Sequence, residues 1–318
     1  MNSQMQTTAT RRSGLLERAW IYQKERFPLA GHGPLIAAFS FCAVSYSRVL
    51  RGGEGLPGLN SLVVAFGCCL LFFLQLRVAD EFKDVEDDAR WRPYRPVPRG
   101  LVSLRELAVL FALGAAVQLG LSLWLDPRLT LVLLGVWIYL AGMCREFFIG
   151  DWLKPRPLLY MVSHMAIMPM VDFFATATDW LPVHGTPPAG LGWFLAASFF
   201  NGMVIEIGRK IRSQPDEEEG VVTYSAAWGR ARAVAGWWLV LTLTLACAVM
   251  AAFRVEAAAV VACVLGVMLL LCVAAGLWLL RRPGAVARGQ WIERMSGLWT
   301  LALYLSLGAG ALIWGSGS

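Results

Sequence analysis

The stretch Asp80-Glu81-Phe82-Lys83-Asp84-Val85-Glu86-Asp87-Asp88 carries six carboxylates in nine residues and directly follows a hydrophobic segment. Four arginines lie within the next eleven residues. On a helix, residues four apart share a face, so Asp80, Asp84 and Asp88 would lie together with Glu81 beside them. Two interpretations fit such a concentration of negative charge. It is either a solvated acidic helix end or a magnesium site, because Mg2+ prefers hard oxygen ligands.

The composition of the whole chain indicates whether the protein is soluble or membrane-embedded. Of 318 residues, 57% are hydrophobic and 16% are charged, against about 25% charged in a typical soluble domain. The chain is therefore expected to be a polytopic membrane protein surrounded by membrane lipid. Lys and Arg at membrane boundaries account for the net charge of +6, so no nucleic-acid partner is predicted. The seven cysteines lack paired ligand spacing, which argues against a disulfide framework or a zinc site.

Nine apolar segments, each near the roughly 20 residues that span a bilayer, predict an all-α helical bundle around a central apolar cavity. We expect a polar tail and an interfacial amphipathic helix over residues 1–33, and a single nine-helix transmembrane domain over residues 34–318. The start of the tail has no apolar core, so no cleaved signal peptide is expected. The expected segments are 34–50, 59–79, 105–125, 129–149, 157–177, 190–206, 230–252, 256–280 and 295–314.

The distribution of basic residues predicts the orientation of the bundle. With an N-terminus inside, 24 of the 28 Lys and Arg residues lie on the cytoplasmic side. We therefore expect a multi-pass protein of the cell membrane, in a bacterial inner membrane, with the charged loops after the second and sixth segments both facing the cytoplasm. These loops faintly echo each other, and duplication with a site between the repeats is a common membrane-protein plan.

The two loops combine carboxylates and cations at the mouth of an apolar bundle. Carboxylates alone could hold magnesium, and cations alone could hold lipid headgroups. Together they fit a magnesium-bound diphosphate with a hydrocarbon tail, whose charge they would stabilise as its bond to carbon breaks. The candidate groups are Asp80, Glu81, Lys83, Asp84, Asp88, Arg92, Arg95 and Arg99 in the first loop, and Glu206, Arg209, Lys210, Arg212, Asp216 and Glu217 in the second.

The first loop resembles a motif of a known family. The pattern Asp80-Glu81-x-x-Asp84-x-x-x-Asp88, followed by Arg92-Pro93-x-Arg95-Pro96-x-Pro98-x-Gly100, is similar to the first aspartate-rich motif of UbiA-type intramembrane prenyltransferases. The segment count and the second loop, which ends Thr223-Tyr224-Ser225-Ala226-Ala227-Trp228-Gly229, look like the same family. The resemblance extends from about residue 26 onward and implies Mg2+ as cofactor, a prenyl diphosphate donor and a small-molecule or lipid acceptor.

The resemblance also implies roles for individual residues. Metal binding carries over to Asp84, Asp88, Asp80 (asparagine in the usual pattern) and Glu81 (usually aspartate). Asp84, Asp88 and Lys210 are the expected catalytic residues. The expected substrate-binding residues are Lys83, Arg92, Arg95, Arg145, Arg209, Arg212 and Tyr224.

The second loop departs from the family pattern. Glu206 stands for the first acid of the usual DxxxD, but Lys210 occupies the place of the second. Asp216 and Glu217 come later, after Pro215. Either Lys210 and Arg212 hold the diphosphate directly, or Asp216 and Glu217 fold back to restore the metal ligands.

Transfer through an allylic carbocation to an aromatic or lipid-like acceptor is the function that the resemblance implies. A terpene cyclase of the same architecture is an alternative, since it captures the cation within its own chain. A transporter is a further alternative, although transport sites usually place polar groups near the bilayer midplane. The intramembrane residue Asp172 is either a functional acid or a residue that makes a structural hydrogen bond, and we favour the second interpretation. His164, one turn after Tyr160, is either an acceptor-orienting group or a packing residue, and Arg145 and Glu146 are either an interfacial pair or a border of the headgroup site.

Overall fold

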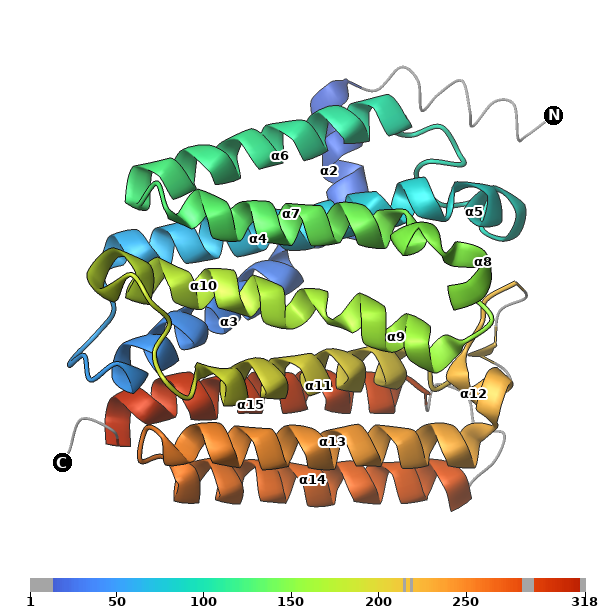
Figure 1. Cartoon of the computed structure of the whole chain (residues 1–318). Helices are drawn as coiled ribbons and strands as arrows, with labels where there is room; N and C mark the ends of the chain where they lie inside the picture. The colour runs from blue at the N-terminus through green and yellow to red at the C-terminus, as the bar shows by residue number, and fades with distance from the viewer. Residues whose placement is uncertain (1–13, 214–215, 218–219, 282–288, 315–318) are drawn as a thin grey trace.

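The computed structural model describes residues 14–213, 216–217, 220–281 and 289–314, and the regular structure in these ranges is helical. Eight helices are long and apolar enough to cross a membrane. They run side by side along a common axis (Figure 1). A helix satisfies its own backbone hydrogen bonds, which apolar segments surrounded by lipid require. The predicted all-α membrane bundle is confirmed.

The long helices follow the predicted apolar segments. Short helices lie in the connections, and one helix precedes the bundle: α2 (Leu15–Arg26), α5 (Val85–Trp91), α8 (Gly150–Leu153) and α12 (Tyr224–Trp228). The long helices are α3 (Leu29–Leu50), α4 (Leu59–Lys83), α6 (Leu104–Leu125), α9 followed by α10 (Pro157–Met165 and Ile167–His184), α11 (Leu191–Arg209), α13 (Arg230–Phe253), α14 (Ala258–Arg281) and α15 (Gly289–Trp314).

The segment expected over residues 129–149 is shorter in the structure. It forms α7 (Leu129–Cys144), an apolar helix of 16 residues that packs against α10 and α6. The helix ends there because Glu146, Phe147 and Phe148 take positive φ angles of 49°, 52° and 62° and form the short turn η1 (Glu146–Phe148). The expected end at residue 149 is therefore wrong, but α7 and the eight long helices together match the nine predicted segments.

Prolines set two further boundaries. The residue before a proline is disfavoured in the α region, so Phe27, with φ −147° and ψ 64°, separates α2 from α3. The first membrane helix consequently begins at Leu29, earlier than the expected residue 34. Pro169 has no N–H for the carbonyl of Met165 and its ring clashes with that carbonyl, which explains why α9 ends at Met165.

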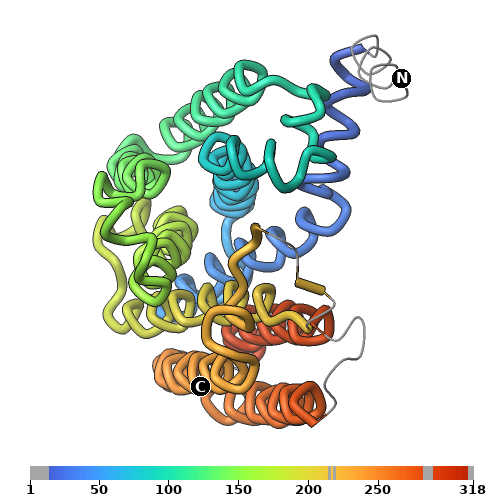
Figure 2. Tube along the Cα trace, turned by 90° about the vertical axis from the view of Figure 1, so that its right-hand side faces the viewer, coloured from blue at the N-terminus to red at the C-terminus, as the bar shows by residue number. Residues whose placement is uncertain are grey.

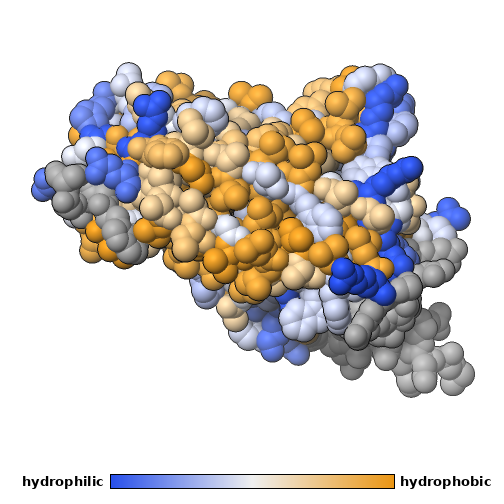
Figure 3. Space-filling model, turned by 90° about the horizontal axis from the view of Figure 1, so that it is seen from below, coloured by the Kyte–Doolittle hydropathy of each residue, from blue (hydrophilic) through white to orange (hydrophobic). Residues whose placement is uncertain are grey.

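The helices divide into inner and outer members. The membrane-crossing windows of α11 and α15 are 61% and 56% buried, whereas those of α14 and α6 are only 17% and 22% buried. Seen end-on, α6 and α14 lie at opposite edges of the bundle (Figure 2), and the surface on the α14 side is mostly apolar between hydrophilic ends (Figure 3). Tyr46 of α3 stacks on Phe194 of α11 with ring centroids 4.7 Å apart. The interior is thus apolar and aromatic, and the outer faces suit lipid.

Helix α2 is fastened to one end of this bundle. Tyr22 packs in a small buried cluster with Val78 and Leu101, while Leu16 and Trp20 remain exposed. A helix with one packed face and exposed apolar side chains suits the membrane surface, and an interfacial position for α2 stays a prediction. The polar tail expected before it lies outside the described residues up to residue 13.

Candidate active site at the charged end of the bundle

The two charged loops lie at the same end of the bundle. The carboxyl ends of α4 and α11 and the short helices α5, α8 and α12 all gather there (Figures 1 and 2). The loops also touch: Gly220, just before α12, lies so close to Trp91 of α5 that an added Cβ would be 2.4 Å from the indole ring. Carboxylates and cations far apart in the sequence therefore border one region.

Asp80 and Asp84 form the acidic side of this region. Asp80 lies on the last turn of α4 and Asp84 caps the helix, one turn later. Burial, followed by repulsion from Asp80 and Asp88, raises the pKa of the half-buried Asp84 carboxyl. Among the described residues, the Asp84 carboxylate has no ion pair or side-chain hydrogen bond, and Asp80 has a long contact of 3.4 Å to Arg77. Negative charge is therefore concentrated here and incompletely compensated.

Asp88 is placed differently from Asp84. It is 2% exposed, and its carboxylate accepts hydrogen bonds from Arg95 Nη1 at 2.6 and 2.8 Å and from Arg92 Nη1 at 3.0 Å. These charge-assisted bonds fold the arginine-proline tail back onto α5. In the structure Asp88 therefore holds the two arginines that the sequence assigns to the substrate.

Glu81 also has an internal partner. Arg26, at the end of α2, donates to Oε1 of Glu81, which is 2% exposed. The pair ties the surface helix to α4 on the side of the bundle where α2 packs. Sequence reasoning did not identify Arg26, because the pair joins residues 55 positions apart.

Lys83 lies at the centre of a polar cluster formed with Glu146, Tyr160 and His164. Its Nζ is 2.7 Å from Glu146 Oε1 and 3.2 Å from His164 Nε2, and it contacts the Tyr160 hydroxyl. The rings of Tyr160 and His164 stack with centroids 3.9 Å apart. Glu146 thus turns toward Lys83 instead of forming the simple interfacial pair with Arg145. Sequence reasoning missed this partnership, whose visible signals were a charged pair at the end of an apolar segment and a Tyr–His pair one turn apart in the next one.

The strained turn after α7 explains how Glu146 reaches this cluster. Left-handed backbone costs about 1–2 kcal/mol per residue for an L-amino acid other than glycine. Glu146, Phe147 and Phe148 all adopt it, and Glu146 is 7% exposed beside Lys83, Tyr160 and His164. Strain of this kind persists where surrounding contacts fix it, and here the contacts of Glu146 supply that fixation.

The carboxyl end of α11 forms the basic side of the region. Glu206 Oε1 lies 2.7 Å from Lys210 Nζ, and Glu206 Oε2 lies 2.7 Å from the Arg209 guanidinium. Lys210 also lies 5.6 Å from the ring of Tyr224. Burial and the Glu206 charge raise the pKa of Tyr224, so its phenol remains neutral. Arg209 is within electrostatic range of Asp80, which connects the basic side to the acidic side.

The remaining predicted residues of the second loop have other partners. Asp216 accepts a hydrogen bond from Ser213, and Glu217 accepts hydrogen bonds of 2.7 and 2.8 Å from Thr223, the residue that caps α12. Arg212 pairs with Glu293 of α15 at 3.3 Å. These residues secure the loop and are not brought to Glu206.

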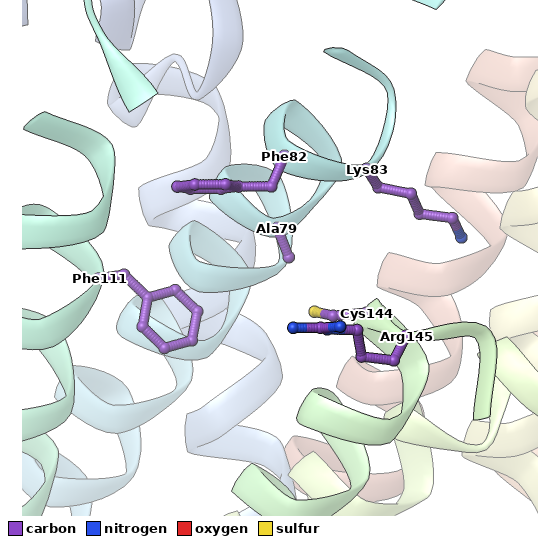
Figure 4. Close-up of a pocket in the computed structure, with 6 residues that line it drawn as sticks. All are labelled: Ala79, Phe82, Lys83, Phe111, Cys144 and Arg145. Atoms are coloured by element: carbon purple, nitrogen blue, oxygen red, sulfur yellow. The ribbon is translucent and has the colours of Figure 1, made fainter. Parts of the chain in front are cut away.

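A cavity of about 330 Å³ opens beside Lys83, between α4, α6 and the end of α7. Its walls are largely apolar, and the Arg145 side chain extends into it between Ala79 and Phe111, whereas Lys83 points away (Figure 4). Arg145 is exposed, and no ion pair to its guanidinium is found among the described residues. A charged guanidinium between aromatic walls can bind an anionic, partly apolar molecule.

The acidic side fits Mg2+ by its donor chemistry. Within the described ranges no three carboxylate, histidine or cysteine side chains gather into a ready-made metal site. Mg2+ does not need one, since it usually binds one or two carboxylates and completes its shell with water and substrate phosphate. Asp80 and Asp84, open and mutually repelling, meet this requirement better than Glu81 or Asp88, which arginines hold.

Comparisons with known proteins identify the family of the chain. Residues 38–296 match the model of the UbiA prenyltransferase family. A curated relative, digeranylgeranylglyceryl phosphate synthase of Pyrococcus abyssi (strain GE5 / Orsay), is 29% identical over 170 residues, which are 52% of this chain and 54% of the relative. The matched region thus spans about half the length of that relative.

Two solved structures share the fold. One comes from a study of digeranylgeranylglyceryl phosphate synthase in membranes, with a TM-score of 0.61, 15% identity, and coverage of 93% of this chain and 99% of that chain. The other is an apo UbiA homologue from Aeropyrum pernix K1, with a TM-score of 0.64, 17% identity, and coverage of 88% and 98%. The family match over most of the chain, on a membrane bundle with both charged loops at one end, shows that the protein is a prenyltransferase and belongs to the UbiA prenyltransferase family.

Proposed function

We propose that this chain is a Mg2+-dependent enzyme that transfers a prenyl group from a (poly)prenyl diphosphate to a small-molecule or lipid-like acceptor, through an allylic carbocation. The observation that carries the proposal is that the two charged loops meet at one end of the bundle: Gly220, before α12, lies against Trp91 of α5, and the charge of Asp80 acts on Arg209. A diphosphate bound there has carboxylates for its metal on one side and cations on the other.

Each side of the region has a distinct task in this proposal. Asp80 and Asp84 would hold Mg2+, which when bound supplies positive charge to the departing diphosphate. Arg209 and Lys210 would bind phosphate oxygens, and Lys83, fixed by Glu146, would add a charge nearby. The apolar interior would exclude the water that otherwise quenches a carbocation.

The cavity at Arg145 supports an acceptor that carries an anionic group. Arg145 reaches into a space bounded by Phe82 and Phe111, so one wall can pair with a negative charge and the others can contact hydrocarbon or an aromatic ring. The relative from Pyrococcus abyssi is named for a lipid phosphate. We therefore favour a lipid-like phosphate or an aromatic carboxylate as acceptor.

The orientation of the protein in the membrane is part of the proposal. By the sequence count, 24 of the 28 Lys and Arg residues belong to the same side as the charged loops, and the positive-inside rule places that side in the cytoplasm. Donor and acceptor would therefore meet at the cytoplasmic face.

A product assay tests the function. Membranes that contain the protein are incubated with a panel of prenyl diphosphates and acceptors, with Mg2+ or with chelator, and products are identified by mass. We expect a prenylated acceptor that forms only with Mg2+. Hydrocarbon released without any acceptor would show a cyclase, and Mg2+-independent flux of substrate into liposomes would show a transporter.

A further inference from the structure

We infer that Lys210 and Arg209 bind the diphosphate directly, and that the carboxyl end of α11 holds no divalent metal ion. The metal would then be held on the α4 side alone. This inference rests on the proposed function in taking a diphosphate as the ligand, and it decides between the two alternatives that the sequence presents for the second loop.

The first observation is that both oxygens of Glu206 already have cationic partners. Oε1 contacts Lys210 Nζ at 2.7 Å, and Oε2 contacts Arg209 Nε and Nη2, each at 2.7 Å. Glu206 itself is 8% exposed. A metal ligand here would have to give up several charge-assisted hydrogen bonds in a poorly solvated place, which is costly.

The second observation concerns the acids that could replace a missing ligand. Asp216 is bonded to Ser213, and Glu217 is bonded to Thr223, the N-cap of α12. Each carboxylate secures the loop to itself and does not fold back toward Glu206. Among the residues that the structure describes in this loop, the donor set at the end of α11 therefore does not fit a divalent ion.

The third observation is that the cations remain accessible. The side chains of Lys210 and Arg209 are 32% and 45% exposed, whereas the Glu206 side chain between them is 10% exposed. Two cations and one carboxylate leave a net positive charge, and both side chains have further N–H donors beyond those that Glu206 uses. Glu206 thus fixes an ammonium and a guanidinium in place for an anion on the Asp80 side.

Two binding measurements on purified protein in lipid nanodiscs test the inference. The first counts Mn2+ ions by electron paramagnetic resonance. The second measures the affinity for inorganic pyrophosphate by calorimetry in the presence of chelator. The variants are Asp84→Asn, Glu206→Gln and Lys210→Met, and the matched control is Lys154→Met, an exposed lysine at the same end of the bundle.

We expect Asp84→Asn to weaken Mn2+ binding by about tenfold or more, and Glu206→Gln and Lys210→Met to leave it within about twofold. Without metal, Lys210→Met should weaken pyrophosphate binding by about tenfold, the scale of one charge-assisted hydrogen bond, while Lys154→Met leaves it unchanged. Loss of a Mn2+ ion in Glu206→Gln, or unchanged pyrophosphate binding in Lys210→Met, would overturn the inference.

These outcomes are separable from those of the product assay. If Glu206→Gln does not fold, Lys210→Met still gives a result, because it keeps the Glu206–Arg209 pair. If Mn2+ and pyrophosphate bind as expected but no prenylated product forms, the proposed function is wrong and the inference still holds. If prenylated product forms but Glu206→Gln loses a Mn2+ ion, the proposed function holds and the inference is wrong.

Discussion

At the scale of single residues, the carboxylates at the charged end of the bundle differ in whether a nearby cation already neutralises them. Glu81, Asp88 and Glu206 have arginine or lysine partners at hydrogen-bond distance, whereas Asp84 faces other carboxylates. Among the described residues, Asp84 has no cation at hydrogen-bond distance, and such a carboxylate has most to gain from binding a metal. Which carboxylate can bind a metal is therefore decided by its ion pairs as much as by its residue type.

Asp84→Asn should lower the rate of prenyl transfer by about a hundredfold or more, while the metal-free variant stays at least as stable as the parent. The sign follows from the raised pKa of Asp84. Above that pKa the ionised carboxylate is disfavoured by burial and is also repelled by Asp80 and Asp88, so its charge costs folding free energy at neutral pH. Thermal unfolding in chelator and in Mg2+ checks this. A melting temperature well below the parent's in chelator would contradict it.

Glu146→Gln should destabilise the protein because it leaves Lys83 without its counter-charge. We expect a loss of about 2 kcal/mol, less than the roughly 3–5 kcal/mol of a fully buried pair, because Lys83 remains 21% exposed. Unfolding of Glu146→Gln, Lys83→Met and the double variant in detergent measures the coupling. Additive effects of the two changes would show that the pair is not coupled.

At the scale of elements, short segments hold the site together and close contacts fix them. The loop before α12 rests on α5 at Gly220, and α15 approaches α3 at Gly308, where an added Cβ would be 2.3 Å from the Cα of Cys42. Glycine is needed at both places because no side chain fits. Small residues at such crossings are the usual means of close helix packing in membranes.

Gly220→Ala should displace the second loop from α5 and weaken pyrophosphate binding by several-fold. Gly229→Ala is the matched control. Gly229 also has a positive φ (80°, against 76° at Gly220), but a Cβ added there has no neighbour within 4 Å. The control suffers backbone strain of about 1–3 kcal/mol without the clash, because its ψ of 149° places it near a region that essentially only glycine adopts. Equal effects of the two changes on pyrophosphate affinity would rule out a role for the contact with Trp91.

Gly308→Ala should lower the free energy of unfolding by about 1–3 kcal/mol, because α15 and α3 must separate to admit the methyl group. Gly297→Ala on the same helix has no neighbour within 4 Å and should be neutral or slightly stabilising, since alanine favours the helix. Chemical unfolding in detergent compares the two variants. Similar stability of both would show that the close approach is not needed.

At the scale of the whole molecule, the bundle separates its tasks along one axis. The charged loops lie at one end, an apolar and aromatic interior fills the middle, and outer helices such as α14 present apolar faces (Figures 1 and 3). This arrangement lets a diphosphate remain near water while its hydrocarbon tail lies in an apolar surrounding.

Single cysteines in a cysteine-free background should report the orientation of this axis. A cysteine at Lys154, at the charged end, should be blocked from an impermeant thiol reagent in intact cells, whereas one at Arg254, in the turn between α13 and α14, should react. The reverse pattern would place the charged end outside and refute the cytoplasmic site.

The sequence alone determined the local features of this protein. Hydrophobic segment length gave the membrane helices, basic-residue counts placed both charged loops on one side, and helical spacing put Asp80 and Asp84 together. The Glu206–Lys210 pair, at i and i+4 on α11, was also within reach of such reasoning. Each of these depends on composition or on spacing along the chain, and both can be read without knowing how the helices pack.

Only the tertiary structure decided which charges are open and which are paired. Arg26 reaches Glu81 from another helix, Lys83 meets Glu146 through a left-handed turn after α7, and Arg212 turns to Glu293. Ion pairs between distant elements depend on how helices pack and where they break, and residue spacing does not encode this. The physical reason is that a charge finds its partner in space, and packing brings together residues that lie far apart in the sequence.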